Sequence, residues 1–218
     1  SRRMTRIADL LAAGPTVSFE FFPPKTDEGR TQLAACVDEL AVIDPTFVSV
    51  TYGAGGTVRD ATHDLVVAID RERAFPAMPH LTCIGHTRDE LTELIGDYRA
   101  AGIENVLALA GDPPVDGSEA VGDFTYASEL VGLVRSIGDM SIAVAAFPEG
   151  HPRSARLPDD RRRLAEKLEA AIARAPSDRH RRAVRRLLGL ELALHGDDVA
   201  AGAAAVVVAG GRHGAPSR

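Results

Sequence analysis

The sequence is poor in cysteine, which limits the kinds of site it can build. Its two cysteines, Cys36 and Cys83, form no Cys-x-x-Cys or zinc-binding pattern and do not suggest a disulfide framework. This usage is typical of a protein from a reducing compartment. Cys36 falls within a helical pattern, and we expect it to be a small core residue.

Long apolar runs and an excess of positive charge are also absent. No stretch reaches the roughly 18 apolar residues of a membrane-spanning helix, and the first residues lack the apolar core of a signal peptide. The formal net charge is −6, which argues against a nucleic-acid or acidic-membrane partner. The sequence therefore predicts a soluble cytoplasmic protein with no nucleic-acid or membrane partner.

Apolar runs alternate with helical periodicity along most of the 218 residues, a length that favours one domain. The apolar runs predict strands at about 16–21, 47–52, 80–84, 105–110 and 141–147. The helical patterns begin near Asp27 and cover 60–73, 88–101, 125–137 and 159–171. Strands and helices alternating at this spacing indicate βαβ units and a parallel sheet. Five such units are visible, whereas a closed (β/α)8 barrel needs eight.

Two boundaries of the predicted helix at 88–101 are marked by individual residues. Thr87 can cap its first turn while Glu90 reaches back to the Thr87 backbone. Gly102 stands just beyond its last turn, where a glycine commonly ends a helix.

One carboxylate, Glu20, lies in the segment Val17–Thr26. The segment begins as an apolar, aromatic run, and this run stops at Pro23-Pro24. Three phenylalanines flank Glu20, and a carboxyl group in apolar surroundings loses hydration. This loss favours its neutral form and suits a general acid. The alternative is a barrel-interior glutamate that is paired with a lysine or arginine, and the segment alone favours neither interpretation.

Four polar residues lie within or just beyond predicted strands: Glu20, Thr51, His80 and Asp112. In parallel α/β barrels the reacting groups lie where the strands end, so these four side chains could converge on one mouth. Each also has a structural interpretation: a backbone-bonding threonine, a satisfied core histidine or a turn residue before proline. Their occurrence at successive strand ends favours a functional site.

Five sequence blocks resemble, in order, the 5,10-methylenetetrahydrofolate reductases, the flavin-dependent TIM barrels of one-carbon metabolism. The first is Ser-Phe-Glu-Phe-Phe-Pro-Pro-Lys at 18–25, and the others lie at 47–54, 79–83, 109–112 and 143–149 with His151-Pro152. The resemblance covers about residues 5–171. It implies a (β/α)8 barrel that is truncated or altered after its fifth βα unit.

The resemblance also implies an activity: NAD(P)H-dependent reduction of 5,10-methylenetetrahydrofolate to 5-methyltetrahydrofolate via FAD, in methionine biosynthesis. Glu20 matches the catalytic glutamate that protonates the folate as its imidazolidine ring opens to an iminium. Asp112 matches the aspartate whose negative charge favours that cation. Hydride would pass from NADH or NADPH to FAD and then to the folate methylene carbon. A homo-oligomer is compatible with this interpretation.

Further positions match residues that contact the flavin in this family. Asp160 suits a ribose hydroxyl and Lys167 suits a phosphate. The matching positions are Thr51, Tyr52, Ala54, His80, Gly111, Asp112, Ala127, Phe147, His151, Asp160 and Lys167.

Several positions depart from the family pattern. Ala110 stands where many members carry Arg, and Phe147 replaces a Tyr and so lacks its hydroxyl. Arg163 and Glu166 stand where better-known bacterial members have Asn and Arg. These changes raise the alternative of a flavin-independent reductase. The family block Thr-Gln-Phe-Phe-Phe-Asp, which serves folate binding, has no counterpart after Ala171.

Residues 172–218 differ in composition from residues 1–171, the expected flavin and folate domain. They contain no Phe, Tyr, Lys, Asn, Gln or Thr and are rich in Ala, Arg and Gly. Because these abundant residues have GC-rich codons, we hypothesise that a shifted reading frame encodes this tail. Within it, 199–211 could form one buried strand or helix, and 180–186 a basic or merely solvated helix face.

Three functional interpretations follow. The first is a methylenetetrahydrofolate reductase, with or without flavin. The second is a catalytically incomplete barrel fragment, whose open strand edges would favour association. The third is a metal-dependent barrel hydrolase with ligands among His63, His80, His86 and Asp112. We expect His63 and His86 on the helix side, which disfavours the hydrolase.

Overall fold

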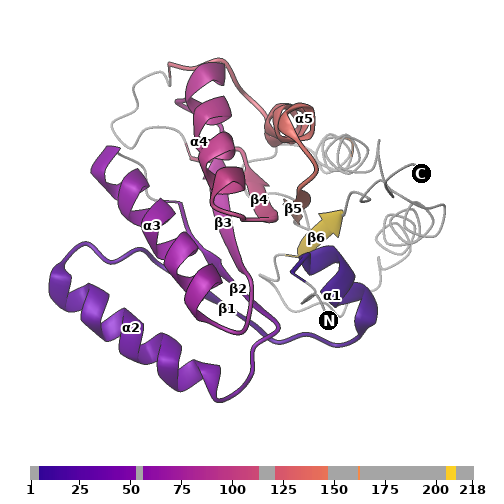
Figure 1. Cartoon of the computed structure of the whole chain (residues 1–218). Helices are drawn as coiled ribbons and strands as arrows, with labels where there is room; N and C mark the ends of the chain where they lie inside the picture. Colours follow the sequence, from indigo (N-terminus) through magenta and orange to yellow (C-terminus); the bar gives the residue numbers. More distant parts are fainter. Residues whose placement is uncertain (1–4, 53–55, 113–120, 147–161, 163–204, 210–218) are drawn as a thin grey trace, which may run out of the picture.

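The computed structural model describes residues 5–52, 56–112, 121–146, 162 and 205–209 (Figure 1). Six strands form its sheet. They are β1 (Ser18–Phe21), β2 (Phe47–Val50), β3 (Ala77–Thr82), β4 (Asn105–Leu109), β5 (Ser141–Ala146) and β6 (Ala205–Ala209). The strands lie in the order in which the chain enters them, β1 to β6.

The first five strands are parallel, so the predicted α/β class with a parallel sheet is confirmed. In this register Glu20 on β1 lies opposite Ser49 on β2, and His80 on β3 lies opposite Leu107 on β4. Because neighbouring parallel strands run the same way, their carboxyl ends meet along one edge. That edge carries the candidate residues.

Successive residues of each strand point to opposite faces of the sheet and form two separate apolar clusters. The larger cluster lies between the sheet and the helices and includes Val48, Val50 and Leu81. The smaller lies on the opposite face and includes Met78 and Leu107. Glu20 and His80 have the parity of the smaller cluster, so the candidate acid stands on the face away from the main helices.

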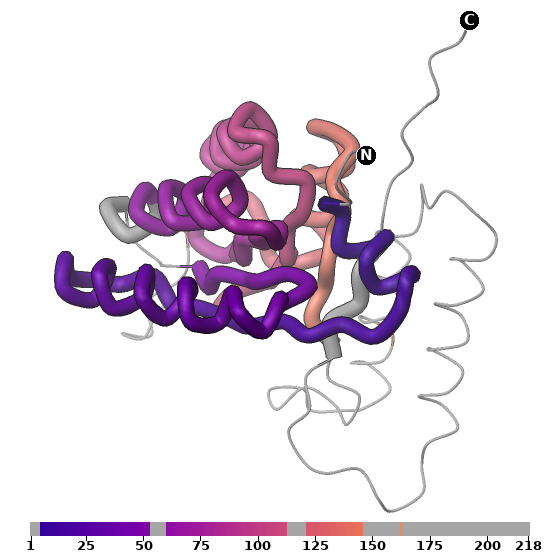
Figure 2. The backbone as a smooth tube through the Cα atoms, turned by 60° about the horizontal axis from the view of Figure 1, so that its bottom comes forward, coloured from indigo at the N-terminus to yellow at the C-terminus, as the bar shows by residue number. Residues whose placement is uncertain are grey.

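The helices follow the amphipathic patterns of the sequence. They are α1 (Ile7–Ala13), α2 (Asp27–Ala41), α3 (Gly56–Glu72), α4 (Arg88–Ala100) and α5 (Ala127–Ile137). Figures 1 and 2 show α2, α3 and α4 side by side along one side of the sheet. Figure 1 shows α1 beside β6. The capping box of Thr87 and Glu90 is confirmed, and Gly102 follows α4 with a φ of 94°.

Helix α1, which the sequence patterns did not predict, covers the amino-terminal ends of β4 and β5. Asn105 accepts a hydrogen bond from the Ile7 backbone N–H at 2.8 Å and donates to the Thr5 carbonyl at 2.7 Å. Arg6 pairs with Asp139 at 2.8 Å. These bonds satisfy buried polar groups and fix the end of the sheet opposite to the candidate site.

β6 comes from the atypical tail and pairs antiparallel with β5. The sequence allowed a strand in 199–211, and part of that run forms one. A closed eight-stranded barrel is not seen among the described residues. The predicted helix at 159–171, apart from helical Arg162, and the basic run 180–186 lie outside the described residues. The proposed boundary after residue 171 stays a prediction.

Two local expectations were wrong. Cys36 is exposed on α2 and does not belong to the core, because the apolar stripe of that helix passes through Leu33, Val37 and Leu40 instead. β3 begins at Ala77, three residues before the predicted start, even though it contains Pro79. Val50 on β2 is the register partner of this proline.

Candidate functional site

Glu20 and His80 come together on the face of the sheet away from the main helices. The Oε2 atom of Glu20 lies 3.4 Å from Nε2 of His80, although the two strands that carry them are separated by β2. Ser49 on β2 is buried between these strands, opposite Glu20. Ser49 was not among the predicted site residues, because a lone serine in an apolar strand carries no distinguishing pattern.

The expected apolar enclosure of Glu20 is not found, since 51% of its side chain is exposed. The reason is strand parity: Phe19 and Phe21 are its neighbours in sequence but pack on the helix side of the sheet. Phe22 is itself 73% exposed. Among the residues that the structure describes, no lysine or arginine pairs with Glu20 either, and its observed neighbour is His80.

His80 is buried, and this burial lowers its pKa to about 4. Desolvation outweighs the attraction of the Glu20 carboxylate, because water screens a half-exposed carboxylate. His80 is therefore neutral near pH 7, and the 3.4 Å contact is not an ion pair at that pH. Its Nε2 atom is buried and makes no hydrogen bond within the described structure.

The ends of β2 and β4 bring three more predicted residues to this edge. Thr51 directly follows β2, and its N–H donates to the Phe21 carbonyl at 2.9 Å. Gly111 has a φ of 92°, and a Cβ at this position would come within 3.0 Å of the Thr82 side chain. Asp112 follows as an exposed residue. The edge thus combines carboxylates, a neutral imidazole and a close backbone approach that requires glycine.

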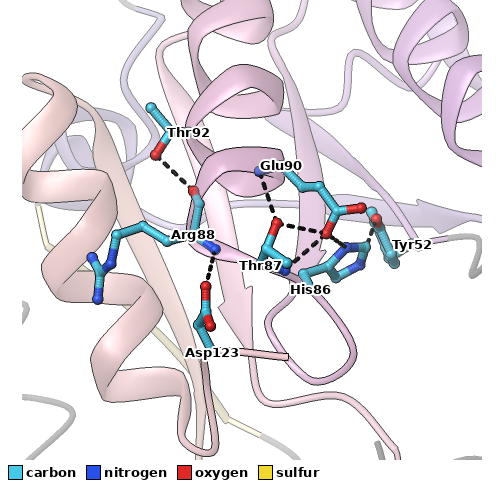
Figure 3. Close-up of polar contacts among 7 residues, drawn as sticks. All are labelled: Tyr52, His86, Thr87, Arg88, Glu90, Thr92 and Asp123. Atoms are coloured by element: carbon cyan, nitrogen blue, oxygen red, sulfur yellow. Dashed lines mark hydrogen bonds and ion pairs between the residues drawn. The ribbon is translucent and has the colours of Figure 1, made fainter. Parts of the chain in front are cut away.

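Tyr52 belongs to a separate group at the rim of this edge, and its ring packs toward the helix-side core. Its hydroxyl lies 2.9 Å from Nε2 of His86, and Nδ1 of that ring lies 3.9 Å from Oε2 of Glu90 (Figure 3). His86 lies in the loop between β3 and α4, where it contacts Tyr52 and not the Glu20–His80 pair. His63 does lie on a helix, α3.

The remaining predicted cofactor residues are not brought to the Glu20–His80 pair by any described contact. Ala127 is buried as the first residue of α5. Five others lie outside the residues whose side chains the structure describes: Ala54, Phe147, His151, Asp160 and Lys167. Their roles stay predictions.

No group of three metal-ligating side chains occurs in the described ranges, which gives no support to the hydrolase interpretation. A pocket of about 450 Å³ lies at the opposite end of the sheet, with Thr5, Glu104 and Asp139 among its lining residues. It is separate from the candidate site. Within the described part of the chain, no helix has the length and apolar character needed to cross a membrane.

The parallel sheet and the polar groups at its carboxyl edge place the protein in the class of α/β proteins that carry their sites at strand ends. The chain belongs to the methylenetetrahydrofolate reductase family, whose family model matches residues 3–174. The 5,10-methylenetetrahydrofolate reductase of Salmonella typhimurium is 44% identical over 160 residues, which are 73% of this chain and 53% of that protein.

Two other relatives give the same result. The Escherichia coli 5,10-methylenetetrahydrofolate reductase is 44% identical, again over 73% of this chain and 53% of its own length. Methylenetetrahydrofolate reductase (NADH) 1 of Arabidopsis thaliana is 39% identical over 67% of this chain and 26% of its own length. The chain therefore spans about half the length of the bacterial relatives, and the tail lies largely outside the family match.

Proposed function

We propose that this chain acts in the NAD(P)H-dependent reduction of 5,10-methylenetetrahydrofolate to 5-methyltetrahydrofolate, with FAD as cofactor, in cytoplasmic one-carbon metabolism and methionine biosynthesis. Family membership supports this proposal. The structural observation that carries it is the contact of half-exposed Glu20 with buried His80 at 3.4 Å. A carboxyl group beside a neutral imidazole, at the edge where such sheets bind substrates, supports Glu20 as the proton donor.

The residues at this edge fit a flavin. The buried Nε2 of His80 makes no hydrogen bond in the described structure, which leaves it able to serve a ligand. Gly111 lets the backbone turn with a positive φ and pack closely against the Thr82 side chain, which holds Asp112 at this edge. Thr51 and Asp112 would complete the binding edge. Flavin, when bound, supplies hydride-transfer chemistry that no side chain can perform.

The protein residues in this proposal handle protons and charge. Glu20 donates a proton to the folate nitrogen as the five-membered ring opens. Its half-exposed carboxyl group can exchange protons with solvent between turnovers. The neutral His80 adds no positive charge that would oppose the cationic iminium of the substrate. Asp112 supplies negative charge that stabilises this cation.

Replacing Glu20 by Gln tests the proposed acid. We expect folate reduction to fall by about 10²- to 10⁴-fold, the usual contribution of a general acid, while nicotinamide oxidation with an artificial acceptor is retained. The matched control is Glu28→Gln, which alters an exposed glutamate in the first turn of α2. Equal loss of both half-reactions in Glu20→Gln would contradict the acid role.

A second candidate is a catalytically incomplete barrel, and the pairing of β6 favours it. This strand lies antiparallel on β5, at the position where a barrel continues with a parallel strand. Visible absorption of the purified chain with added FAD separates the two candidates when combined with folate binding. Flavin binding without folate binding would support the incomplete barrel, and binding of both would support the reductase.

The flavin-independent alternative is motivated by Ala110, which stands where many family members carry Arg. A folded, monodisperse sample that reduces folate with nicotinamide but binds no FAD would support it. In that case Glu20 and Asp112 would keep their proposed roles.

A further inference from the structure

The contact between Glu20 and His80 crosses a strand that carries neither residue. Strand β2 lies between β1 and β3 in the sheet, yet Oε2 of Glu20 lies 3.4 Å from Nε2 of His80. Neighbouring strands lie about 4.8 Å apart, so β1 and β3 are separated by about twice that distance. The two side chains therefore meet over the face of β2.

The register of the sheet shows which side chain of β2 borders this contact. Glu20 is the register partner of Ser49, and Ser49 is the register partner of Met78 on β3. Because register partners point to the same face of a sheet, Ser49 shares the face of Glu20. Met78 is buried in the smaller apolar cluster, at the position of β3 directly across from Glu20. The Glu20 carboxylate accordingly reaches His80, which lies two residues further along β3 on the same face.

The pairing of the strands changes at His80. The β2–β3 pairing ends with Val50 and Pro79, and the β3–β4 pairing begins with His80 and Leu107. β3 therefore exchanges β2 for β4 as its register partner at this point. Within the described register no residue of β2 is paired with His80, so the side chains of β2 decide how closely Glu20 can approach it.

Ser49 is small, and little free space surrounds it. It is only 7% exposed, although it lies on the face away from the main helices. Thr51, two residues further along, has the same parity and a β-branched side chain, so this face of β2 is already bulkier toward the carboxyl edge. A larger side chain at position 49 has to displace a neighbour, and the half-exposed Glu20 is free to move into solvent.

We propose that Ser49 is a positioning residue, whose small side chain allows Glu20 to lie across β2 beside His80. A β-branched residue at this position would turn Glu20 toward solvent and separate its carboxyl group from the imidazole. The role requires the lack of bulk and not the hydroxyl group. Its catalytic consequence rests on the proposed function, because that function takes Glu20 as the proton donor, whereas the steric relation among the three side chains does not.

Nitrogen-15 NMR of the chain with labelled histidine tests the steric relation without any ligand. The chain has seven histidines, and His80→Gln identifies the resonances of His80. A carboxylate beside Nε2 favours the tautomer that carries its proton on this atom. At pH 7 we expect Glu20→Gln to shift the Nε2 resonance of His80, because it removes the neighbouring charge. In a Ser49→Val background, the same Glu20→Gln change should cause no shift.

Three further backgrounds separate the bulk of residue 49 from other effects. Ser49→Ala removes the hydroxyl without adding bulk, so the shift caused by Glu20→Gln should persist. Ser49→Thr keeps the hydroxyl and adds one methyl group, so it should reduce the shift, and it repeats the test if Ser49→Val does not fold. Ser18→Val is the matched control, because Ser18 is an exposed residue of β1 that is paired with Phe47 and not with Ser49. The shift should persist in it.

Three results of this experiment would overturn the inference. The first is a full shift in both Ser49→Val and Ser49→Thr, which would show that bulk at this position does not separate Glu20 from His80. The second is a lost shift in Ser49→Ala, which would assign the role to the hydroxyl. The third is the absence of any shift in the wild-type background.

Steady-state kinetics measure the consequence for the reaction. Ser49→Val should lower kcat for folate reduction by about 10²-fold, a usual cost of misplacing a reacting group, while nicotinamide oxidation with an artificial acceptor is retained. Adding Glu20→Gln to Ser49→Val should cost little further, because both changes remove the same positioned acid. Ser18→Val should keep the wild-type kcat.

The kinetic outcomes distinguish this inference from the proposed function. A double variant that loses the full effect of Glu20→Gln in addition to that of Ser49→Val would overturn the positioning role and leave Glu20 as the acid. A wild-type chain that does not reduce folate would count against the proposed function, and the NMR result would still decide the role of Ser49.

Discussion

Two buried polar side chains at opposite ends of the parallel sheet, Asn105 and His80, differ in whether the protein satisfies their hydrogen bonds. At the amino-terminal end, both side-chain atoms of Asn105 that can form hydrogen bonds are paired with the backbone that leads into α1, at 2.8 and 2.7 Å. At the carboxyl end, Nε2 of His80 is buried without a hydrogen bond in the described structure, and burial lowers its pKa to about 4. The fold itself satisfies Asn105, whereas Nε2 of His80 keeps the capacity to form a hydrogen bond with a ligand.

This difference indicates which buried polar groups of a parallel sheet can take part in ligand binding. A satisfied polar group stabilises the fold and has no capacity left for a ligand. An unsatisfied one destabilises the fold unless a ligand completes it, and this situation is typical of functional sites. The contrast predicts that substitution of Asn105 changes stability alone, whereas substitution of His80 changes stability and ligand binding in opposite directions.

The largest expected stability effect is at the amino-terminal end. Asn105→Ala leaves the Ile7 N–H and the Thr5 carbonyl without their partner, which should lower the free energy of unfolding by about 3 kcal/mol. Urea unfolding measures this loss. Ser141→Ala is the control, with a smaller effect, because its bond to the Ala8 N–H is longer, at 3.4 Å. A loss in ligand affinity comparable to the loss in stability would break the comparison.

The next effect is a pH dependence at the carboxyl end. The pKa of His80 is about 4 in the folded chain, against an ordinary value of 6.5, so the unfolded chain binds the proton first as the pH falls. The contribution of His80 to stability is therefore complete above pH 6.5 and is lost progressively toward pH 4. Between pH 7 and pH 5 we expect a loss of about 2 kcal/mol.

His80→Gln should remove this part of the pH dependence, whereas His63→Gln should keep it. Urea unfolding at the two pH values measures both. A His80→Gln variant with the wild-type slope between pH 5 and pH 7 would show that His80 is not the neutral, desolvated group described above.

The smallest expected effect on stability is at the start of α4, where Thr87 caps the helix. Thr87→Ala removes the hydroxyl that accepts from the Glu90 N–H and should cost about 1 kcal/mol in urea unfolding. Thr92 lies on the same helix, and its hydroxyl only donates back to the Arg88 carbonyl at 2.7 Å (Figure 3). Thr92→Ala should therefore be neutral or slightly stabilising. The reverse order of the two variants would contradict the capping role.

The regular part of the fold was predictable because each strand and main helix has its own local pattern. The apolar runs located five strands to within a few residues, and Thr87 with Glu90 marked the start of α4. Helix α1 was missed because its seven residues are too short to establish a period. β3 was predicted at about 80–84 but spans Ala77–Thr82, because a strand that contains a proline, here Pro79, has a weak local signal.

The candidate site was predictable only in part, for a geometric reason. Polar residues near strand ends could be chosen from the sequence as candidate site residues, since the carboxyl ends of parallel strands lie along one edge of the sheet. The surroundings of Glu20 could not, because neighbours in sequence lie on opposite faces of a strand. The partnership of Tyr52 with His86 depends on how two loops approach each other, and neither loop has a periodic pattern that would indicate it.

The pairing of β6 with β5 has a consequence for how the chain folds. Each parallel strand meets its neighbour after roughly 30 residues of chain, whereas β6 meets β5 only after residues 147–204. The entropy of closing a loop grows with the logarithm of its length, so this doubling adds only about 0.6 kcal/mol to the cost of pairing. The rate is affected more, since contacts distant in sequence form late. We therefore expect the β1–β5 unit to assemble first and the β6 hydrogen bonds to be the last to gain protection in pulsed hydrogen exchange.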